Sequence, residues 1–303
     1  MSLYLKYRPK DLSQIKGNKS LVDSLNNMLS NKETCPHTFL LHGPTGCGKT
    51  TIARIIANEL GCHERDFIEI NTADLRGIDT SREIINRSQF APIQGSIMVW
   101  LIDECHKLTN DAQNALLKLL EDTPKHIYII LCTTDPQKLL STIKGRCIQF
   151  QVSPLNDIEM FQLLRRIVRD EKEELNKQIF DQIIETSQGL PRNAIQILEQ
   201  VLNTSEEERL TTAKKNIDNQ TEIIELCRAL LKNSNWNQVK EILARLKGQE
   251  AESIRRVVLG YCQAILLKSE NDKAAMIIEE FWEPTYDIGF PGIVYACYSI
   301  INK

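Results

Sequence analysis

The chain is expected to fold as an α/β domain with a parallel sheet, followed by a region made only of helices. Up to about residue 152, short apolar runs alternate with segments of helical periodicity. Strands that alternate with helices in this way form a parallel sheet with helices on both faces. From Asp157 onward the sequence shows helical patterns and no convincing strand. A glycine-rich segment, GPTGCGKT at residues 43–50, joins the first apolar run to a helical segment.

Five apolar runs are predicted to be strands, because they are rich in aliphatic and aromatic residues and too short for helices. They cover residues 38–43, 66–71, 97–104, 127–134 and 147–152. Helical spacing of apolar residues marks the segments between them, at residues 49–60, 80–90 and 111–122. These segments are the predicted covering helices of the sheet.

The second half of the chain is predicted to be helical throughout. Its first helix follows an Asn-Asp cap and places Ile158, Phe161, Leu164 and Val168 on one face. Further helices are expected near residues 176–188, 191–202, 221–233, 237–248 and 251–269, with a polar linker or solvated helix start at 203–215. From these changes of pattern we predict three domains, at residues 1–153, 154–205 and 206–303.

The composition is that of an ordinary globular protein. Hydrophobic residues make up 42% of the chain, and no run approaches the roughly 18 apolar residues of a membrane helix. Charges stand at the amino terminus where a signal peptide needs an apolar core, so we expect a cytoplasmic protein. The net charge of −3 gives no overall attraction to nucleic acid, so a DNA contact would need a local patch. The nine cysteines form no C-x-x-C pair, and we expect reduced, mostly buried thiols.

Residues 43–50 match the phosphate-loop pattern G-x-x-x-x-G-K-[ST] without a mismatch, between a predicted strand and a predicted helix. Glycines let backbone amides turn toward phosphate oxygens, and the amino terminus of the helix adds a partial positive charge. Lys49 is predicted to reach the β- and γ-phosphates, and the Thr50 hydroxyl is predicted to bind Mg²⁺. The segment therefore predicts binding of a nucleoside triphosphate with Mg²⁺.

Two adjacent acids follow the third predicted strand, in the segment VWLIDE. Asp103 is predicted to orient the Mg²⁺ coordination shell with Thr50, and Glu104 to polarise the attacking water. Glu104 is one residue further along and is expected on the other side of the strand pleat. A hydrolase needs both roles, so the pair predicts hydrolysis; two ordinary surface carboxylates are the alternative.

Six motifs follow one another along residues 6–199. They are KYRPKDLSQIKGN (6–18), HGPTGCGKTT (42–51), NTADLRGID (71–79), LIDECHKLTNDAQNALLKLLEDTP (101–124), TTDPQKLLSTIKGRCIQF (133–150) and GLPRNAIQILE (189–199). Together they resemble the clamp-loader subunits of the AAA+ ATPases, which include replication factor C small subunits and the bacterial DNA polymerase III tau/gamma subunit. The resemblance covers residues 4 to about 200, and the stretch from DECHKLT through GRC is its most specific part.

This resemblance implies an AAA+ phosphate-loop core, an all-α lid of three helices and an all-α collar that joins subunits. It implies an ATPase that uses ATP and Mg²⁺ in a ring or spiral of five subunits, in the cytoplasm of a bacterium or a phage-infected cell. The expected partners are other clamp-loader subunits, a sliding clamp and primer–template DNA, with no membrane. ATP binding would assemble a state that opens the clamp, and DNA would trigger hydrolysis and release.

The resemblance also implies roles for single residues outside the phosphate loop. Thr134 matches the sensor of the γ-phosphate and attacking water, and Arg146 matches the arginine that reaches a neighbouring subunit's ATP site. Arg192 matches a second sensor, in the lid, and Asn71 a polar residue that couples DNA binding to hydrolysis. The alternatives are a strand end for Thr134, a surface cation for Arg146 and a helix cap for Arg192.

The segment YRP at residues 7–9 matches the family's adenine-pocket lining, with a plain extended segment before proline as the alternative. The expected nucleotide-binding set is Tyr7, Arg8, Pro9, Gly43, Pro44, Thr45, Gly46, Cys47, Gly48, Lys49, Thr50, Thr51 and Arg192. The expected catalytic set is Lys49, Asp103, Glu104, Thr134 and Arg146, with Thr50 and Asp103 as metal ligands.

DNA contact is expected from the segment after ADLRGID, because in the family helices line a spiral around the duplex. The candidate residues are Arg76, Thr80, Ser81, Arg82 and Arg87. The first helical turn offers backbone amides that suit phosphate, so contacts would be to the DNA backbone and sensitive to salt. A solvated charged face is the alternative.

The sequence departs from the family pattern in three places. It has only Cys62 where the bacterial subunit carries a four-cysteine zinc module, so we predict no structural zinc. Gly145 replaces the usual serine before the Arg-Cys pair, and the sequence reaches Lys303 without the long tail of tau. Two alternative functions remain. One is a stator-like subunit with little useful hydrolysis, and the other is a different AAA+ DNA-remodelling ATPase such as a Holliday-junction motor. A winged-helix domain after the lid would favour the motor.

Overall fold

The computed structural model describes residues 2–302 except 32–33, 73–76, 233, 250, 268 and 286–287, and the side chains of residues 214–221 are also left out of the description. The chain divides into two compact units, Met1–Ala213 and Lys214–Lys303. The first unit contains both the sheet and the helices that follow it up to residue 202. The three predicted domains stay a prediction.

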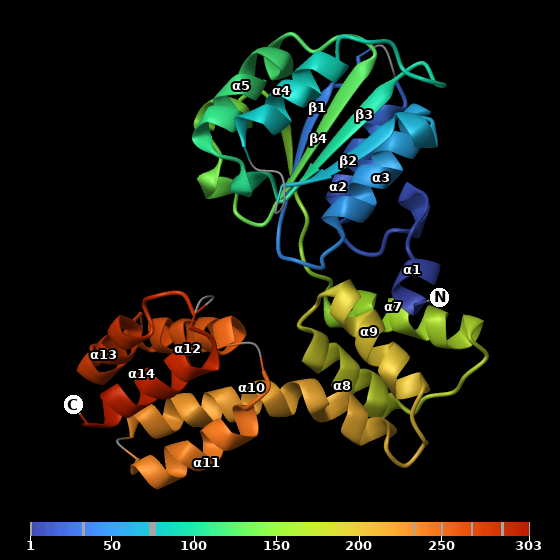
Figure 1. Cartoon of the computed structure of the whole chain (residues 1–303). Coiled ribbons are helices and arrows are strands. Elements are labelled where there is room, and N and C mark those ends of the chain that lie inside the picture. The colour runs from blue at the N-terminus through green and yellow to red at the C-terminus, as the bar shows by residue number, and fades with distance from the viewer. Residues whose placement is uncertain are drawn as a thin grey trace. The chain divides into compact units, whose positions relative to one another are not determined.

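The first unit is built on five parallel strands in the order β2-β3-β4-β1-β5 (Figure 1). The strands are β1 (Thr38–His42), β2 (Phe67–Asn71), β3 (Met98–Asp103), β4 (Ile127–Thr133) and β5 (Ile148–Gln151). Each lies within the predicted run, which is longer by one residue or less at either end. The predicted α/β fold with a parallel sheet is confirmed.

Helices cover both faces of the sheet (Figure 1). They are α2 (Lys19–Leu29) and α3 (Lys49–Leu60) on one face, and α4 (Ile78–Arg87), α5 (Asn110–Glu121) and α6 (Ser141–Lys144) on the other. Neighbouring residues of a strand point to opposite faces. Leu41 and Leu101 therefore pack in the core with α2 and α3, whereas Leu40 and Ile102 pack in the core with α4 and α5.

A separate helical cluster follows the sheet within the first unit. It contains α7 (Asp157–Asp170), α8 (Lys177–Ser187), α9 (Pro191–Leu202) and the short amino-terminal helix α1 (Leu3–Lys6). The predicted apolar face of α7 is wrong at Ile158, whose side chain is 71% exposed. The buried residues Met160, Leu164, Ile167 and Val168 set the inner face. Ile158 lies two residues before Met160, about 200° around the helix, and so faces solvent.

The described part of the second unit consists of helices and the connections between them, with no strand. Its helices are the carboxy-terminal part of α10 (Arg209–Leu231), α11 (Trp236–Leu246), α12 (Ala251–Leu266), α13 (Asp272–Glu280) and α14 (Phe290–Asn302). Apolar side chains such as Leu226, Val239, Ile254 and Ile300 form a single core. Among the described residues of the chain, no helix has the length and apolarity to cross a bilayer.

Candidate functional site

The carboxyl ends of β1, β3 and β4 meet at one edge of the sheet, because these three parallel strands are close neighbours in it. The phosphate loop follows β1 and leads directly into α3. Asp103 is the last residue of β3, and Thr134 follows the last residue of β4. In open parallel sheets ligands bind outside the carboxyl ends of the strands, so the topology gathers the predicted residues at such a place.

The phosphate loop depends on its glycines. Gly43, Gly46 and Gly48 have φ angles of 153°, 82° and 107°, a region that other residues rarely adopt. A Cβ atom on Gly43 would collide with the carbonyl oxygen of Val152. On Gly46 it would lie 3.3 Å from the Cβ of Arg192, at the start of α9. The loop is therefore packed closely against the segment after β5 and against α9.

Lys49 is buried inside the phosphate loop. Its Nζ donates to the carbonyl oxygens of Gly43 and Pro44 at 2.8 and 2.9 Å, and the residue is 6% exposed. The two carbonyls hold the ammonium group at the loop, where it is available to an anion bound by the loop amides. Gly43 and Pro44 thus hold the Lys49 ammonium group through their carbonyl oxygens. Lys49 itself lines the pocket described below.

Thr50 and Asp103 lie side by side. The Thr50 hydroxyl donates to Asp103 Oδ2 at 2.9 Å, and the Glu104 N–H donates to Asp103 Oδ1 at 2.9 Å. Both carboxylate oxygens of Asp103 are thereby oriented by neighbouring groups. A hydroxyl and a carboxylate beside a phosphate loop are the oxygen ligands that Mg²⁺ uses together with phosphate.

Glu104 lies just beyond the strand, and this corrects its expected placement on the pleat. The strand ends at Asp103, and Glu104 adopts the left-handed conformation with φ 51° and ψ 36°. The Thr134 hydroxyl donates to Glu104 Oε2 at 3.4 Å, and His106 Nδ1 lies 3.5 Å from the same oxygen. Burial lowers the pKa of His106, so this ring is neutral at pH 7 and the contact is not an ion pair there.

Thr72 supports the backbone of the acid pair and was not singled out by the sequence. Its buried hydroxyl lies 2.6 Å from the carbonyl oxygen of Glu104 and 3.0 Å from that of Asp103, and its N–H donates to the latter at 3.2 Å. The preceding residue, Asn71, pairs in register with Asp103. The sequence indicates a role for Thr72 only through its position, directly after β2, the strand that pairs with β3.

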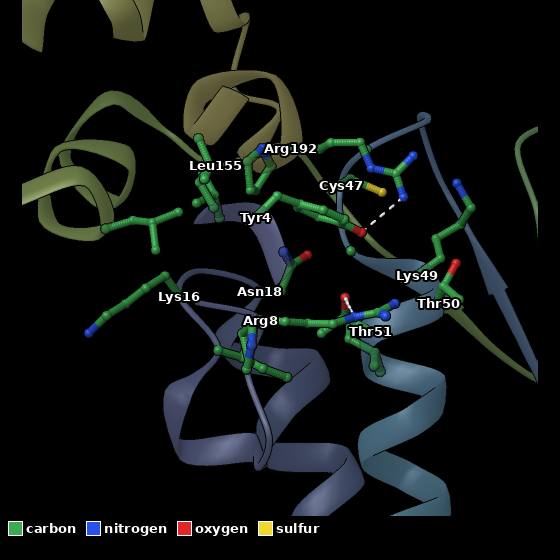
Figure 2. A pocket seen from close by; sticks show the side chains of 18 of the residues that line it. Tyr4, Arg8, Lys16, Asn18, Cys47, Lys49, Thr50, Thr51, Leu155 and Arg192 are labelled. Carbon is green, nitrogen blue, oxygen red and sulfur yellow. Dashed lines mark hydrogen bonds between the residues drawn. The ribbon is translucent and has the colours of Figure 1, made fainter. Parts of the chain in front are cut away.

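A pocket of about 980 Å³, part of it open to solvent, is bordered by the phosphate loop, the amino-terminal segment and the helices α7 and α9 (Figure 2). Residues predicted from the sequence line it: Tyr7, Arg8, Pro9, Thr45, Gly46, Cys47, Gly48, Lys49, Thr50, Thr51, Asp103, Glu104 and Arg192. Further lining residues were not predicted: Tyr4, Gln14, Ile15, Lys16, Asn18, Ile52, Leu155, Leu163, Pro191 and Ile195. Most of these further residues are apolar or aromatic, and they add an apolar region next to the charged loop, which suits a nucleotide base.

The YRP segment connects the pocket to two other elements. Arg8 Nε donates to the Thr51 hydroxyl of α3 at 3.1 Å, and burial lowers the pKa of Arg8. The Tyr7 hydroxyl donates to Glu171 at the end of α7. Burial and this hydrogen bond raise the pKa of Tyr7 to about 12. The Tyr7 hydroxyl is therefore bound to the helical cluster, while the residue still lines the pocket.

Arg192 stands at the start of α9, next to the phosphate loop. Its backbone N–H donates to the Gly46 carbonyl at 3.3 Å. The Nε atom is buried and has no hydrogen-bond partner within the part of the chain that the structure describes. A buried donor of this kind fits a site that an anion completes.

Arg146 lies outside the pocket. It follows α6, and its guanidinium donates to Glu121 at 2.7 Å and to the Thr142 carbonyl at 3.0 Å. Its side chain is 30% exposed. Arg146 therefore does not join the acid pair of its own chain.

The residues expected at DNA have different surroundings. Thr80 and Ser81 lie in the first turn of α4 but are buried, and the Ser81 hydroxyl donates to the Ala112 carbonyl. The Ser81 hydroxyl is thus not available to a duplex. Arg82 and Arg87 are exposed and pair with acids of their own helix. Arg76 lies outside the described residues.

Two family models and several curated relatives are similar to this chain in sequence. The family model for the DNA polymerase III delta subunit matches residues 65–156, and that for the Sigma-54 interaction domain matches residues 15–97. DNA polymerase III subunit gamma of Buchnera aphidicola (subsp. Schizaphis graminum) is 33% identical over 240 residues, which are 72% of this chain and 64% of that protein. The chain is a homologue of DNA polymerase III gamma and tau.

Other relatives agree with this homology. Subunit gamma/tau of Mycobacterium tuberculosis (strain H37Rv) is 32% identical over 67% of this chain and 39% of that protein. Subunit tau of Escherichia coli K12 is 31% identical over 69% of this chain and 36% of that protein. The chain thus spans well under half the length of these gamma/tau relatives. The resemblance to clamp-loader subunits is confirmed.

Solved structures show the fold of this gamma/tau homologue. The Thermotoga maritima RuvB Holliday junction branch migration motor has a TM-score of 0.60 and 21% identity, over 74% of this chain and 79% of that protein. This likeness shows the AAA+ fold alone. Among the described residues no group of three or more His, Cys, Asp and Glu side chains is arranged to hold a metal ion. The expected lack of structural zinc stays a prediction.

Proposed function

We propose that the chain is an ATP-hydrolysing subunit of a clamp loader, which helps open a sliding clamp and load it onto primer–template DNA. The homology to gamma and tau supports this proposal. One geometric observation carries it: the phosphate loop, the Thr50–Asp103 contact at 2.9 Å and Glu104 share one pocket. We also propose that it acts in the cytoplasm with other loader subunits, as one of five in a ring or spiral, and without a membrane.

The donor set of the pocket fits ATP with Mg²⁺. The Lys49 ammonium is held by loop carbonyls, and the buried Nε of Arg192 lacks a partner among the described residues. A bound triphosphate would accept charge-assisted hydrogen bonds from both cations. Thr50 and Asp103 would hold Mg²⁺, which when bound neutralises charge on the phosphates. Tyr7, Arg8 and Pro9 would border the adenine, and Thr45, Cys47 and Thr51 complete the proposed nucleotide contacts.

The chain's own residues perform the proposed hydrolysis by positioning and charge stabilisation. Glu104 orients the attacking water and accepts its proton at the carboxylate, while Thr134 steadies that carboxylate through Oε2. Lys49 stabilises the charge on the β- and γ-phosphates. No covalent intermediate is needed, because the loop and the acids hold phosphate and water together.

Two further sets of contacts belong to this proposal. Arg82 and Arg87 would bind the DNA backbone, with a strong dependence on salt. Arg146 would act on the ATP site of a neighbouring subunit. Residues 1–153 would form the ATPase core, 154–205 the lid and 206–303 the collar.

The test is ATP hydrolysis by the purified chain, alone and with partner subunits, clamp and primed DNA. We expect weak hydrolysis by the chain alone and strong stimulation by the full set of partners. Glu104→Gln should lower kcat by about 10²- to 10⁴-fold and leave the Kd for ATP nearly unchanged, because only the general base is lost.

Glu59→Gln on the exposed side of α3 is the control and should behave like the wild type. Basal hydrolysis with every partner present would contradict the loader assignment. Unchanged clamp loading by Glu104→Gln would instead favour a stator-like subunit.

A further inference from the structure

The Arg192 guanidinium rests against Tyr4 of helix α1 (Figure 2). Arg192 Nη2 donates to the Tyr4 hydroxyl oxygen at 3.1 Å, and the guanidinium carbon lies 5.1 Å from the centre of the Tyr4 ring. An aromatic ring attracts a cation over its face, and a phenol oxygen accepts from it. Tyr4 thus supports Arg192 in two ways.

Contacts on either side of Tyr4 hold α1 against the helical cluster. The Glu199 carboxylate of α9 accepts from the Ser2 hydroxyl at 2.9 Å and from the Leu3 N–H at 3.1 Å. Lys6 pairs with Glu171, at the end of α7, at 2.6 Å. The place of Tyr4 beside Arg192 is therefore set by protein contacts that involve no nucleotide.

Arg192 needs such support. A long arginine side chain has large rotamer freedom, and a ligand that must immobilise it binds less tightly. The backbone of Arg192 already contacts the phosphate loop through Gly46, and both Tyr4 and Arg192 line the pocket. A guanidinium held in one place at the edge of this loop meets the outermost phosphate with less loss of entropy.

We propose that Tyr4 is a positioning residue that holds the Arg192 guanidinium at the phosphate loop, so that the pocket binds ATP more tightly than ADP. This inference rests on the proposed ATP binding. It adds a residue through which the pocket distinguishes ATP from ADP. Tyr4 acts through Arg192, not by touching the phosphates. A direct contact of its ring with the base would instead strengthen ATP and ADP binding alike.

The experiment measures the Kd of the full chain for ATP and for ADP, each with Mg²⁺, by titration calorimetry. Tyr4→Leu should raise the Kd for ATP about five- to tenfold and that for ADP by less than about twofold, as the loss of a desolvated cation–ring contact predicts. Tyr4→Phe keeps the ring and loses the acceptor, so its effect should be smaller and equally selective for ATP. Arg192→Ala should lose at least as much ATP affinity as Tyr4→Leu.

The double variant Tyr4→Leu/Arg192→Ala should bind ATP no worse than Arg192→Ala alone, because Tyr4 acts only through Arg192. Leu5→Ala, at a position of α1 that is 49% exposed and makes none of the side-chain contacts described above, is the matched control and should keep the ATP preference. Equal losses for ATP and ADP, additive losses in the double variant, or the same selective loss in Leu5→Ala would each overturn the inference. A wild-type chain that binds no ATP would overturn the proposed function itself.

Discussion

At the end of β3 two neighbouring acids have different surroundings. Both carboxylate oxygens of Asp103 accept hydrogen bonds at 2.9 Å, from Thr50 and from the Glu104 N–H. Among the residues that the structure describes, the Glu104 carboxylate makes longer side-chain contacts, with Thr134 at 3.4 Å and His106 at 3.5 Å. The Asp103 carboxylate is thus held at both oxygens, whereas the Glu104 carboxylate is held less closely. Glu104 lies beyond the end of the strand, where its backbone has the left-handed conformation.

The Thr72 hydroxyl holds that left-handed turn, which leads to a prediction. Thr72→Val removes the hydroxyl and keeps the shape of the side chain. Because the Glu104 carbonyl then loses its hydrogen bond at 2.6 Å, kcat for ATP should fall. We expect about a three- to tenfold decrease, with little change in the Kd for ATP. Thr72→Ser, which restores the hydroxyl, should recover most of the activity. A weakened Kd with unchanged kcat would contradict this role.

At the scale of single elements, helix α12 carries a buried carboxylate that binds it to the segment after α13. Glu252 is 5% exposed and accepts from Arg255, from Arg256, and from the N–H and hydroxyl of Thr285. The Arg255 hydrogen bond is the largest cause that lowers the pKa of Glu252, to about 2, against the effect of burial. The ionised form is therefore the form that stabilises the second unit.

The contacts of Glu252 predict that the stability of the second unit depends on pH. Because the folded pKa lies below the ordinary value of 4.5, the contribution is complete above pH 4.5 and is lost as the pH falls toward 2. Glu252→Gln should lower the free energy of unfolding at pH 7 by about 2 kcal/mol and flatten its decrease below pH 4.5. Urea unfolding at several pH values measures both, with exposed Glu241→Gln as the control. Parallel pH profiles for the wild type and Glu252→Gln would contradict the assignment.

At the scale of the whole molecule, the acid pair and Arg146 are separate. Arg146 pairs with Glu121 and does not line the pocket that contains Glu104. A partly exposed arginine outside its own site is suited to act on a neighbouring subunit's site, where it stabilises developing charge on the transferred phosphoryl group. Assembly would then decide the rate of hydrolysis.

Arg146→Ala should lower ATP hydrolysis by the assembled complex without changing ATP binding by the isolated chain. We expect the isolated chain to keep its Kd for ATP and its weak hydrolysis, because its own pocket is intact. Hydrolysis by the assembled complex should fall by about 10³-fold, the lower end of the range for an arginine that acts on a transferred phosphoryl group. Arg169→Ala, at a surface position 78% exposed on α7, is the control. An equal loss in the isolated chain would show that Arg146 acts within its own subunit.

The strands, the phosphate loop and the acid pair were predictable from the sequence for a physical reason. Alternation, turn residues and the spacing of the loop depend on residues that are neighbours in the chain. The topology of parallel strands then brings the loop and the acids together, because their carboxyl ends share one edge. The same reasoning was wrong about Glu104, which was expected on the pleat of the strand. Glu104 lies instead in a turn, which is stabilised by a hydrogen bond from Thr72 at the end of a neighbouring strand.

The sequence by itself determined a parallel α/β core, a helical remainder and a phosphate-binding loop followed by two acids. Tertiary structure alone decided which side chains support them. Tyr4 lies beside Arg192, and Thr72 beneath Glu104, through contacts between segments far apart in the chain. Such contacts leave no period or spacing in the sequence, since they arise only when helices and strands pack.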